Sequence, residues 1–117
     1  MKRILILDDN HDYLEMISLI LRKDYDVVAL STVSQIHEVD PETKFDAIIM
    51  DYNIGIDKAP DVIPIVNTIP NLKNVPKMLV TGSVGIDKEI RKLEFDIFLQ
   101  KPFSNKDLKM KISQLIN

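Results

Sequence analysis

The segment from Phe45 to Tyr52 constrains the fold of this chain most, because four apolar residues, Ala47–Met50, run directly into the carboxylate of Asp51. Polar and apolar positions do not alternate in this run, which is typical of a strand buried on both faces of a parallel sheet. Asp51 would then lie at the carboxyl edge of the sheet. Because open α/β sheets bind their ligands at that edge, we expect Asp51 to be the reactive group and the other strands to supply its helpers.

Further apolar runs of strand length alternate with helical patterns along the chain. The other expected strands cover residues 4–7, 27–30, 78–80 and 97–99, and the expected helices cover 12–22, 33–39, 60–69, 86–93 and the segment after Ser104. Strict alternation of strands and helices predicts a parallel sheet with helices on both faces, since each crossover must be right-handed and cover the sheet. The predicted fold is an α/β domain with five parallel strands, and this single domain fills residues 1–117.

Several local signals refine this prediction. A loop is expected at 53–59. In the helix expected at 60–69, Pro60 suits the first turn, whereas Pro64 lies further in and is expected to kink or delay the helix. Ser104, with Asp107 three residues later, is typical of a capping box at the start of the last helix.

The composition excludes several classes of function. The chain has 117 residues, a formal net charge of −3 and no basic stripe of the kind that nucleic-acid-binding surfaces carry. The absence of cysteine excludes disulfides and thiolate metal sites. The apolar run before Asp8 is only four residues long, too short for a secretion signal or a membrane span. We expect a soluble, cytoplasmic protein that binds neither nucleic acid nor membrane directly.

Polar side chains follow four of the five expected strands. Asp8 and Asp9 follow the first strand, Asp51 ends the third, Thr81 ends the fourth and Lys101 follows the fifth. Three carboxylates at one edge repel each other unless a cation joins them, and an all-oxygen ligand set suits Mg²⁺. Aspartate forms aspartyl-phosphates, and Mg²⁺, a lysine and a hydroxyl can neutralise the phosphoryl oxygens. The sequence therefore predicts a site that accepts a phosphoryl group.

The chain resembles the receiver domain of two-component response regulators along essentially its whole length. Four pieces carry the resemblance by their order, strand-end placement and spacing: Leu7-Asp8-Asp9-Asn10, Ile49-Met50-Asp51-Tyr52, Leu79-Val80-Thr81-Gly82 and Phe98-Leu99-Gln100-Lys101-Pro102-Phe103. The resemblance implies the flavodoxin-like fold of CheY-type receivers. It also implies a phosphorylation-controlled signalling domain rather than an enzyme.

The resemblance further implies how the acidic residues would act. Asp51 would accept the phosphoryl group from a sensor histidine kinase or a histidine phosphotransfer protein. Asp9 would bind Mg²⁺ directly and Asp8 would bind it through water. The backbone carbonyl of Asn53 would complete the metal site.

The remaining roles implied by the resemblance concern the phosphoryl oxygens and the switch. Thr81 would hydrogen-bond the phosphoryl group, and Lys101 would pair with its oxygens. Phe98 would turn inward when Thr81 moves toward the phosphate. The peptide bond between Lys101 and Pro102 corresponds to one that is cis in the family.

The sequence departs from the family pattern beside the acceptor. The family usually carries proline four residues after the acceptor and glycine eight residues after it, where this chain has Gly55 and Ala59. The stretch between Thr81 and Phe98 is short and lacks the glycine usually found before the fifth strand. These departures leave the phosphorylation residues untouched and concern the 53–59 loop and the fourth helix.

Several alternatives remain open at the level of single residues. Asp8 and Asp9 could instead cap the first helix. Met16, Leu19 and Ile20 either widen the packing of that helix or form an apolar docking patch for a kinase or phosphotransfer bundle.

Alternatives also remain open for the whole chain. It is either a stand-alone receiver or the N-terminal receiver of a longer regulator, for example one with a DNA-binding output. It is either a monomer or a phosphorylation-linked homodimer, for which Asp96 and Lys106 are placed like pairing charges. A Mg²⁺-dependent aspartyl-phosphate phosphatase fits less well, because Asn10 stands where such enzymes need a second acid.

Overall fold

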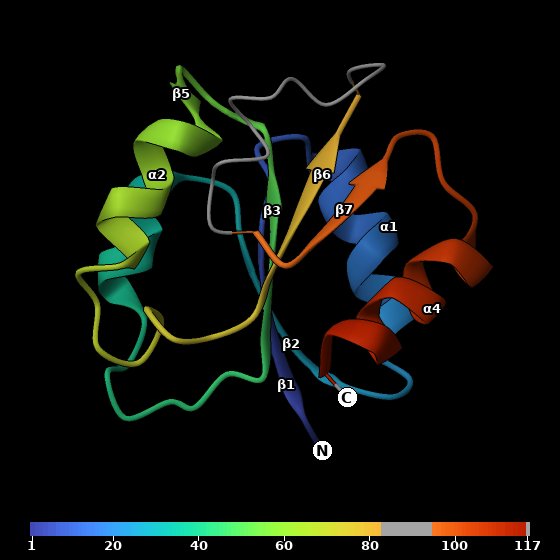
Figure 1. Ribbon diagram of the computed structural model, residues 1–117, viewed down its shortest axis with the longest axis horizontal. Coiled ribbons are helices and arrows are strands. Elements are labelled where there is room, and N and C mark those ends of the chain that lie inside the picture. Colours follow the sequence, from blue (N-terminus) through green and yellow to red (C-terminus); the bar gives the residue numbers. More distant parts are fainter. Residues whose placement is uncertain (83–94, 117) are drawn as a thin grey trace.

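The computed structural model describes residues 1–82 and 95–116. Within these residues, five strands form one sheet in the order β2-β1-β3-β6-β7, and all neighbouring pairs are parallel (Figure 1). The strands are β1 (Arg3–Leu7), β2 (Asp26–Leu30), β3 (Ala47–Asp51), β6 (Lys77–Thr81) and β7 (Ile97–Gln100). The predicted parallel sheet is confirmed, and each expected strand agrees with the observed one to about a residue at either end.

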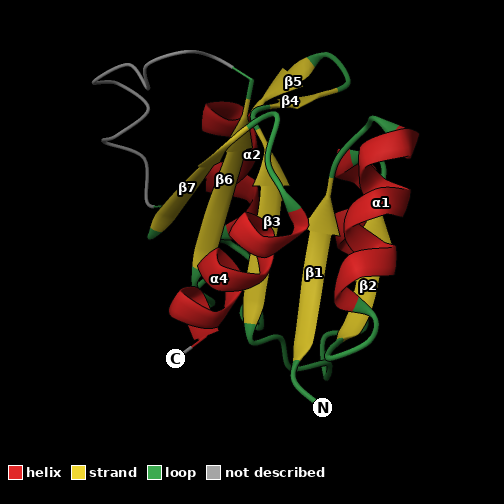
Figure 2. Cartoon of the chain, turned by 90° about the vertical axis from the view of Figure 1, so that its right-hand side faces the viewer, coloured by secondary structure: helices red, strands yellow, loops and turns green. Residues whose placement is uncertain are grey.

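Helices cover both faces of the sheet, as predicted. α1 (His11–Leu21) and α4 (Asn105–Ile116) lie on one face, and α2 (Ala59–Val66) and the 3₁₀ helix η1 (Val33–Glu38) lie on the other (Figures 1 and 2). The helix expected at 86–93 lies outside the described residues. In the part of the chain that the structure describes, no helix is long and apolar enough to cross a membrane.

The central strand β3 explains the uninterrupted apolar run, because its two faces are buried in different clusters. Ile48 and Met50 pack in the cluster beneath η1 and α2, whereas Ala47 and Ile49 pack in the cluster beneath α1 and α4. Each of these four side chains is at most 1% exposed. Full burial of an aliphatic side chain contributes about 1.5–3 kcal/mol, so β3 is held firmly and Asp51 has a fixed position at its end.

Side chains outside the acidic cluster cap the first and last helices. Asn10 is the N-cap of α1, and its Oδ1 accepts hydrogen bonds from two backbone N–H groups of the first turn, at 3.0 and 3.1 Å. The alternative in which Asp8 or Asp9 caps α1 is therefore wrong. Ser104 Oγ accepts a hydrogen bond from the Asp107 N–H at 3.0 Å, which confirms the predicted start of α4.

The segment expected as a loop at 53–59 is a short antiparallel hairpin of β4 (Asn53–Ile54) and β5 (Asp57–Lys58). Figure 2 shows this hairpin beyond the carboxyl ends of the parallel strands. The turn needs Gly55, whose φ of 64° lies in the left-handed region that side chains with a Cβ disfavour. The expectation of an irregular loop was wrong because two-residue strands leave no periodic signal in a sequence.

α2 is shorter than the helix expected at 60–69. It begins at Ala59, keeps Pro60 in its first turn as predicted, contains Pro64 and ends at Val66. Beyond it the Thr68 hydroxyl donates a hydrogen bond to the carbonyl of Ile65 at 2.6 Å. That bond competes with the helical pattern, because hydroxyl side chains offer the backbone a local alternative.

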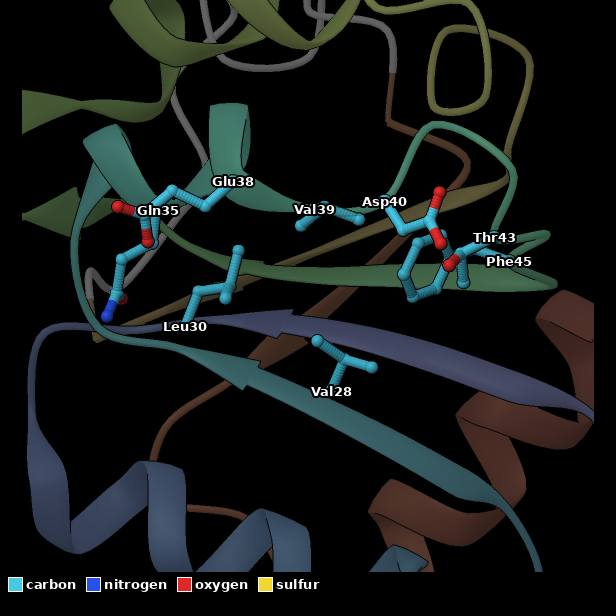
Figure 3. A pocket seen from close by; sticks show the side chains of 8 residues that line it. All are labelled: Val28, Leu30, Gln35, Glu38, Val39, Asp40, Thr43 and Phe45. Atoms are coloured by element: carbon cyan, nitrogen blue, oxygen red, sulfur yellow. The ribbon is translucent and has the colours of Figure 1, made fainter.

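The helix expected at 33–39 is the 3₁₀ helix η1, and it is too short to cover β2 fully. A cavity of about 300 Å³ lies between β2 and the segment that follows η1. Figure 3 shows Val28 and Leu30 rising from β2 toward Val39 and Phe45 across this cavity. This cavity lies beside the β2 edge of the sheet, and Asp8, Asp9 and Asp51 do not line it.

Candidate functional site

The three predicted carboxylates meet at the carboxyl edge of the sheet. β1 and β3 are parallel neighbours with Leu7 opposite Met50, so the residues that follow the paired positions, Asp8 and Asp51, lie side by side. One carboxylate oxygen from each of Asp8, Asp9 and Asp51 lies within 4.8 Å of the others. Asp8 is 2% exposed and Asp51 is 8% exposed, whereas Asp9 is exposed to solvent. The predicted acidic cluster is therefore formed, with one open side.

Lys101 reaches this cluster from the end of β7. Its backbone N–H donates to the Thr81 carbonyl at 2.8 Å, which holds the start of the following loop against β6. Its Nζ lies 3.2 Å from Asp51 Oδ1 and 3.5 Å from Asp8 Oδ2. The Lys101–Pro102 peptide is cis, as the family resemblance implies. Hydrogen bonds between charged groups are stronger than those between neutral groups. The Lys101 ammonium therefore stabilises the two buried carboxylates beside each other.

Burial sets the electrostatics of the cluster. Desolvation raises the pKa of Asp51, repulsion from Asp9 raises it further, and the Lys101 ammonium opposes the rise. Desolvation likewise raises the pKa of Asp8, repulsion from Asp51 adds to this, and an N–H from Asn10 and the Lys101 ammonium oppose it. The Lys101 ammonium does not offset the cost of burying these carboxylates, so a further positive charge would stabilise their ionised forms.

The donor set suits a hard divalent cation. Its three side chains offer carboxylate oxygens only, and the chain has no cysteine that could add a thiolate. Mg²⁺ prefers such oxygen ligands and keeps several waters, for which the exposed side at Asp9 leaves access. Asp8, Asp9 and Asp51 could therefore hold Mg²⁺. The contribution of the Asn53 backbone carbonyl stays a prediction.

The β4–β5 hairpin is attached to the acidic cluster. The Gly55 N–H donates a hydrogen bond to Asp9 Oδ2 at 2.9 Å. At the base of the hairpin, Asn53 pairs with Lys58, whose Nζ donates to Asn53 Oδ1. The departure from the family pattern at Gly55 thus produces a turn whose backbone supports one of the predicted metal ligands.

Thr81 and Phe98 lie on the neighbouring strands β6 and β7, and their switching roles stay predictions. Thr81 is the last residue of β6 and is 1% exposed, at the same edge as Asp51. Phe98 is half-buried in β7, and its ring centroid lies 6.3 Å from that of Phe95. It packs against the apolar cluster beneath η1 and α2.

The apolar stripe of α1 divides between packing and exposure. Met16 and Ile20 are half-buried against the cluster beneath α1 and α4. Leu19 is 54% exposed. Wide core packing therefore accounts for Met16 and Ile20, and Leu19 is the member of the stripe that is open to a partner.

Two residues beside the site were missed by the sequence analysis. The ring of Tyr13, in the first turn of α1, has its centroid 3.9 Å from Lys101 Nζ and 6.0 Å from the centroid of Phe103. Lys58 contacts Asn53 across the hairpin. Neither follows one of the five strands that the apolar runs predict, so only the folded arrangement reveals them.

The geometry agrees with a comparison against known families. A family model described as the response regulator receiver domain matches residues 4–113. The chain belongs to this family. The receiver is therefore a domain of two-component signalling, and the resemblance found in the sequence is confirmed. A comparison with curated proteins gives no match.

Solved structures confirm the CheY-like receiver fold. The chemotaxis response regulator CheY4 of Vibrio cholerae is 21% identical, with a TM-score of 0.87 and 98% of each chain covered. The receiver domain of HemR from Leptospira biflexa is 22% identical, with a TM-score of 0.85, and the match covers 100% of this chain and 95% of that one. The receiver domain of the sensor histidine kinase PA1611 from Pseudomonas aeruginosa is 23% identical, with a TM-score of 0.85 and coverage of 98% and 97%. It holds a magnesium ion in its active-site cleft.

Proposed function

We propose that this receiver accepts a phosphoryl group on Asp51 from a phosphohistidine of a sensor histidine kinase or a histidine phosphotransfer protein. An Asp51 oxygen forms the new P–O bond, and the P–N bond to the donor imidazole breaks, with its electron pair staying on the imidazole. One observation carries the proposal: Asp51 lies in a cluster with two further carboxylates and 3.2 Å from the Lys101 ammonium. Phosphoryl transfer depends mainly on such positioning and charge neutralisation.

The residues around Asp51 would bind the metal ion and neutralise the phosphoryl oxygens. Asp8, Asp9 and Asp51, with the Asn53 carbonyl, would hold Mg²⁺. When bound, Mg²⁺ supplies positive charge to the phosphoryl oxygens. Lys101 already contacts Asp51 and is placed to pair with an oxygen of the group that Asp51 accepts.

The output of the receiver would follow from Thr81 and Phe98. Thr81 brings a hydroxyl to the edge that holds Asp51, and the β6 register places Leu79 opposite Phe98 on β7. A hydrogen bond from Thr81 to the phosphoryl group would shift the end of β6 and give Phe98 space to turn inward. Partners that read this change would dock on the β6–β7 side. Because the proposed kinase donor is a cytoplasmic domain, we place this receiver in the cytoplasm.

The proposal is tested by intact mass spectrometry. Incubation with Mg²⁺ and acetyl phosphate is expected to add one phosphoryl group to the wild type. The receiver itself carries the acceptor Asp51, the proposed metal ligands and Lys101, so the transfer should not need the kinase. Asp51→Asn is expected to remove the adduct, whereas Asp24→Asn, an exposed carboxylate outside the site, is expected to keep it.

Two results would overturn the proposal. One is a wild-type protein without any adduct under these conditions. The other is continuous turnover of phosphate esters, which would favour the aspartyl-phosphate phosphatase instead.

A further inference from the structure

Among the described residues, the ammonium of Lys101 lies beside two carboxylates and the uncharged ring of Tyr13. It lies 3.2 Å from Asp51 Oδ1, 3.5 Å from Asp8 Oδ2 and 3.9 Å from the centroid of the Tyr13 ring. The Lys101 side chain is 15% exposed. A cation over an aromatic face is attracted by the ring quadrupole, and the attraction grows when water is largely excluded. The Tyr13 ring therefore attracts the ammonium independently of the two carboxylates.

The position of the Tyr13 ring is fixed by the chain around it. The Tyr13 N–H donates to Asn10 Oδ1 at 3.1 Å, in the capped first turn of α1. The Tyr13 ring contacts the ring of Phe103 at a centroid distance of 6.0 Å, with a tilt of 51°. Tyr13 thus lies between the cap of α1 and the loop after Lys101. This arrangement gives the ring little freedom to leave the ammonium.

The contact with the Tyr13 ring matters because Asp8 and Asp51 are also predicted metal ligands. Asp8 and Asp51, which contact Lys101, also belong to the cluster that fits a divalent cation. Such a cation would compete with the ammonium for these carboxylates, and two positive charges a few ångströms apart repel each other. The Tyr13 ring takes no part in that competition.

We propose that Tyr13 is a positioning residue, whose ring face holds the Lys101 ammonium beside Asp51 while the carboxylates are shared with a metal ion. The inference rests on the proposed function, since Lys101 needs this position to neutralise the phosphoryl group. It depends on the ring and not on the hydroxyl. Phenylalanine at position 13 should therefore act as tyrosine does, and leucine should not.

The first test measures the rate of phosphorylation by acetyl phosphate with saturating Mg²⁺. Tyr13→Leu is expected to slow the reaction by about tenfold, the scale of a partly desolvated cation–π contact expressed as a rate ratio. Tyr13→Phe is expected to keep the wild-type rate within about twofold. Tyr25→Leu removes a half-buried tyrosine before β2, at the opposite edge of the sheet, and serves as the matched control. Leucine is a good helix former, and thermal unfolding checks that each variant is folded.

The second test needs neither metal nor phosphoryl group. Protons over the face of an aromatic ring are shifted upfield, so the Lys101 side chain should show an upfield NMR shift in the metal-free wild type. The shift should persist in Tyr13→Phe, and a metal-free wild type without it would overturn the contact. This readout reports the position of the ammonium, which a purely structural role of Tyr13 in packing against Phe103 would not predict.

The outcomes separate the two claims. A phosphorylated wild type with an unaffected Tyr13→Leu rate would overturn the positioning role and leave the proposed function standing. An equal loss of rate in Tyr13→Phe and Tyr13→Leu would also overturn it, since the ring would then not be the active part. A wild type without adduct would overturn the proposed function itself.

Discussion

At the scale of single residues, the ionisation of Asp8 and Asp51 is coupled to their burial. Both carboxylates follow buried strands and lie in a cluster with Asp9, and both have a raised pKa because desolvation outweighs the attraction of Lys101. In the unfolded chain these carboxyls have their ordinary pKa. The folded protein therefore holds protons on Asp8 and Asp51 at pH values where the unfolded chain has released them. This difference makes stability depend on pH.

We expect the metal-free protein to lose stability as the pH rises. The protonated carboxyls are favoured by the fold, so their contribution is fully present below the ordinary carboxyl pKa and is lost as the pH rises through the raised pKa of Asp8 and Asp51. Urea unfolding measured between pH 4 and pH 8 without divalent cations checks this. Added Mg²⁺ should recover stability at neutral pH, because binding to the folded state alone stabilises it.

Replacing Asp8 by asparagine measures how much this one carboxylate contributes to the free energy of unfolding. Asp8→Asn should raise the free energy of unfolding of the metal-free protein at pH 7 and should weaken its dependence on pH, because it removes one buried charge. Asp24→Asn, an exposed residue, is the matched control and should change neither quantity appreciably. A metal-free protein whose stability increases from pH 4 to pH 8 would contradict this interpretation.

At the scale of elements, the β4–β5 hairpin is the part of the site that sequence reasoning described least well. Its strands have two residues each, and its turn depends on one glycine and on the hydrogen bond from Gly55 to Asp9. The long strands and helices were predictable because burial imposes a period on them. A hairpin held by a turn and a contact with a residue 46 positions away imposes no such period.

The hairpin makes Gly55 sensitive to substitution. Gly55→Ala should lower the free energy of unfolding by about 1–2 kcal/mol, the cost of holding a residue with a Cβ in the left-handed region. The cost is conformational, because a Cβ at Gly55 would have no neighbour within 4 Å among the described residues. Gly82→Ala is the matched control: its Cβ would likewise meet no described residue within 4 Å and its φ is not in that region, so a smaller loss is expected. Equal losses in the two variants would contradict this account.

At the scale of the whole molecule, the sheet separates two apolar clusters, one on each face. The site lies at the carboxyl edge of the sheet. Ile112 of α4 is fully buried in the cluster beneath α1 and α4. Its side chain packs in this cluster and is not part of the acidic cluster. Damage to this cluster should therefore change stability and leave the chemistry of the folded protein intact.

Ile112→Ala should lower the free energy of unfolding by about 2–5 kcal/mol, the range for a buried aliphatic side chain replaced by alanine. The half-buried Ile116 on the same helix is the matched control, and Ile116→Ala should cost less. Urea unfolding gives both values. Acetyl phosphate should still phosphorylate the folded Ile112→Ala protein at about the wild-type rate, and a selective loss of phosphorylation would show that α4 acts on the site.

The sequence by itself determined the parallel sheet, its five strands and the acidic cluster at its edge. Continuous apolar runs indicate burial on both faces, and parallel strands bring their carboxyl ends to one edge, so Asp8, Asp51 and Lys101 could be placed together without coordinates. Only the tertiary structure decided that Asn10 caps α1, that residues 53–58 form a hairpin attached to Asp9, and that Tyr13 contacts Lys101. The cap itself is local, since Asn10 accepts from residues two and three positions later, but asparagine and aspartate cap helices about equally well, so the sequence left the choice among Asp8, Asp9 and Asn10 open. The contacts of Gly55 with Asp9 and of Tyr13 with Lys101 join residues distant in sequence, which no local pattern specifies.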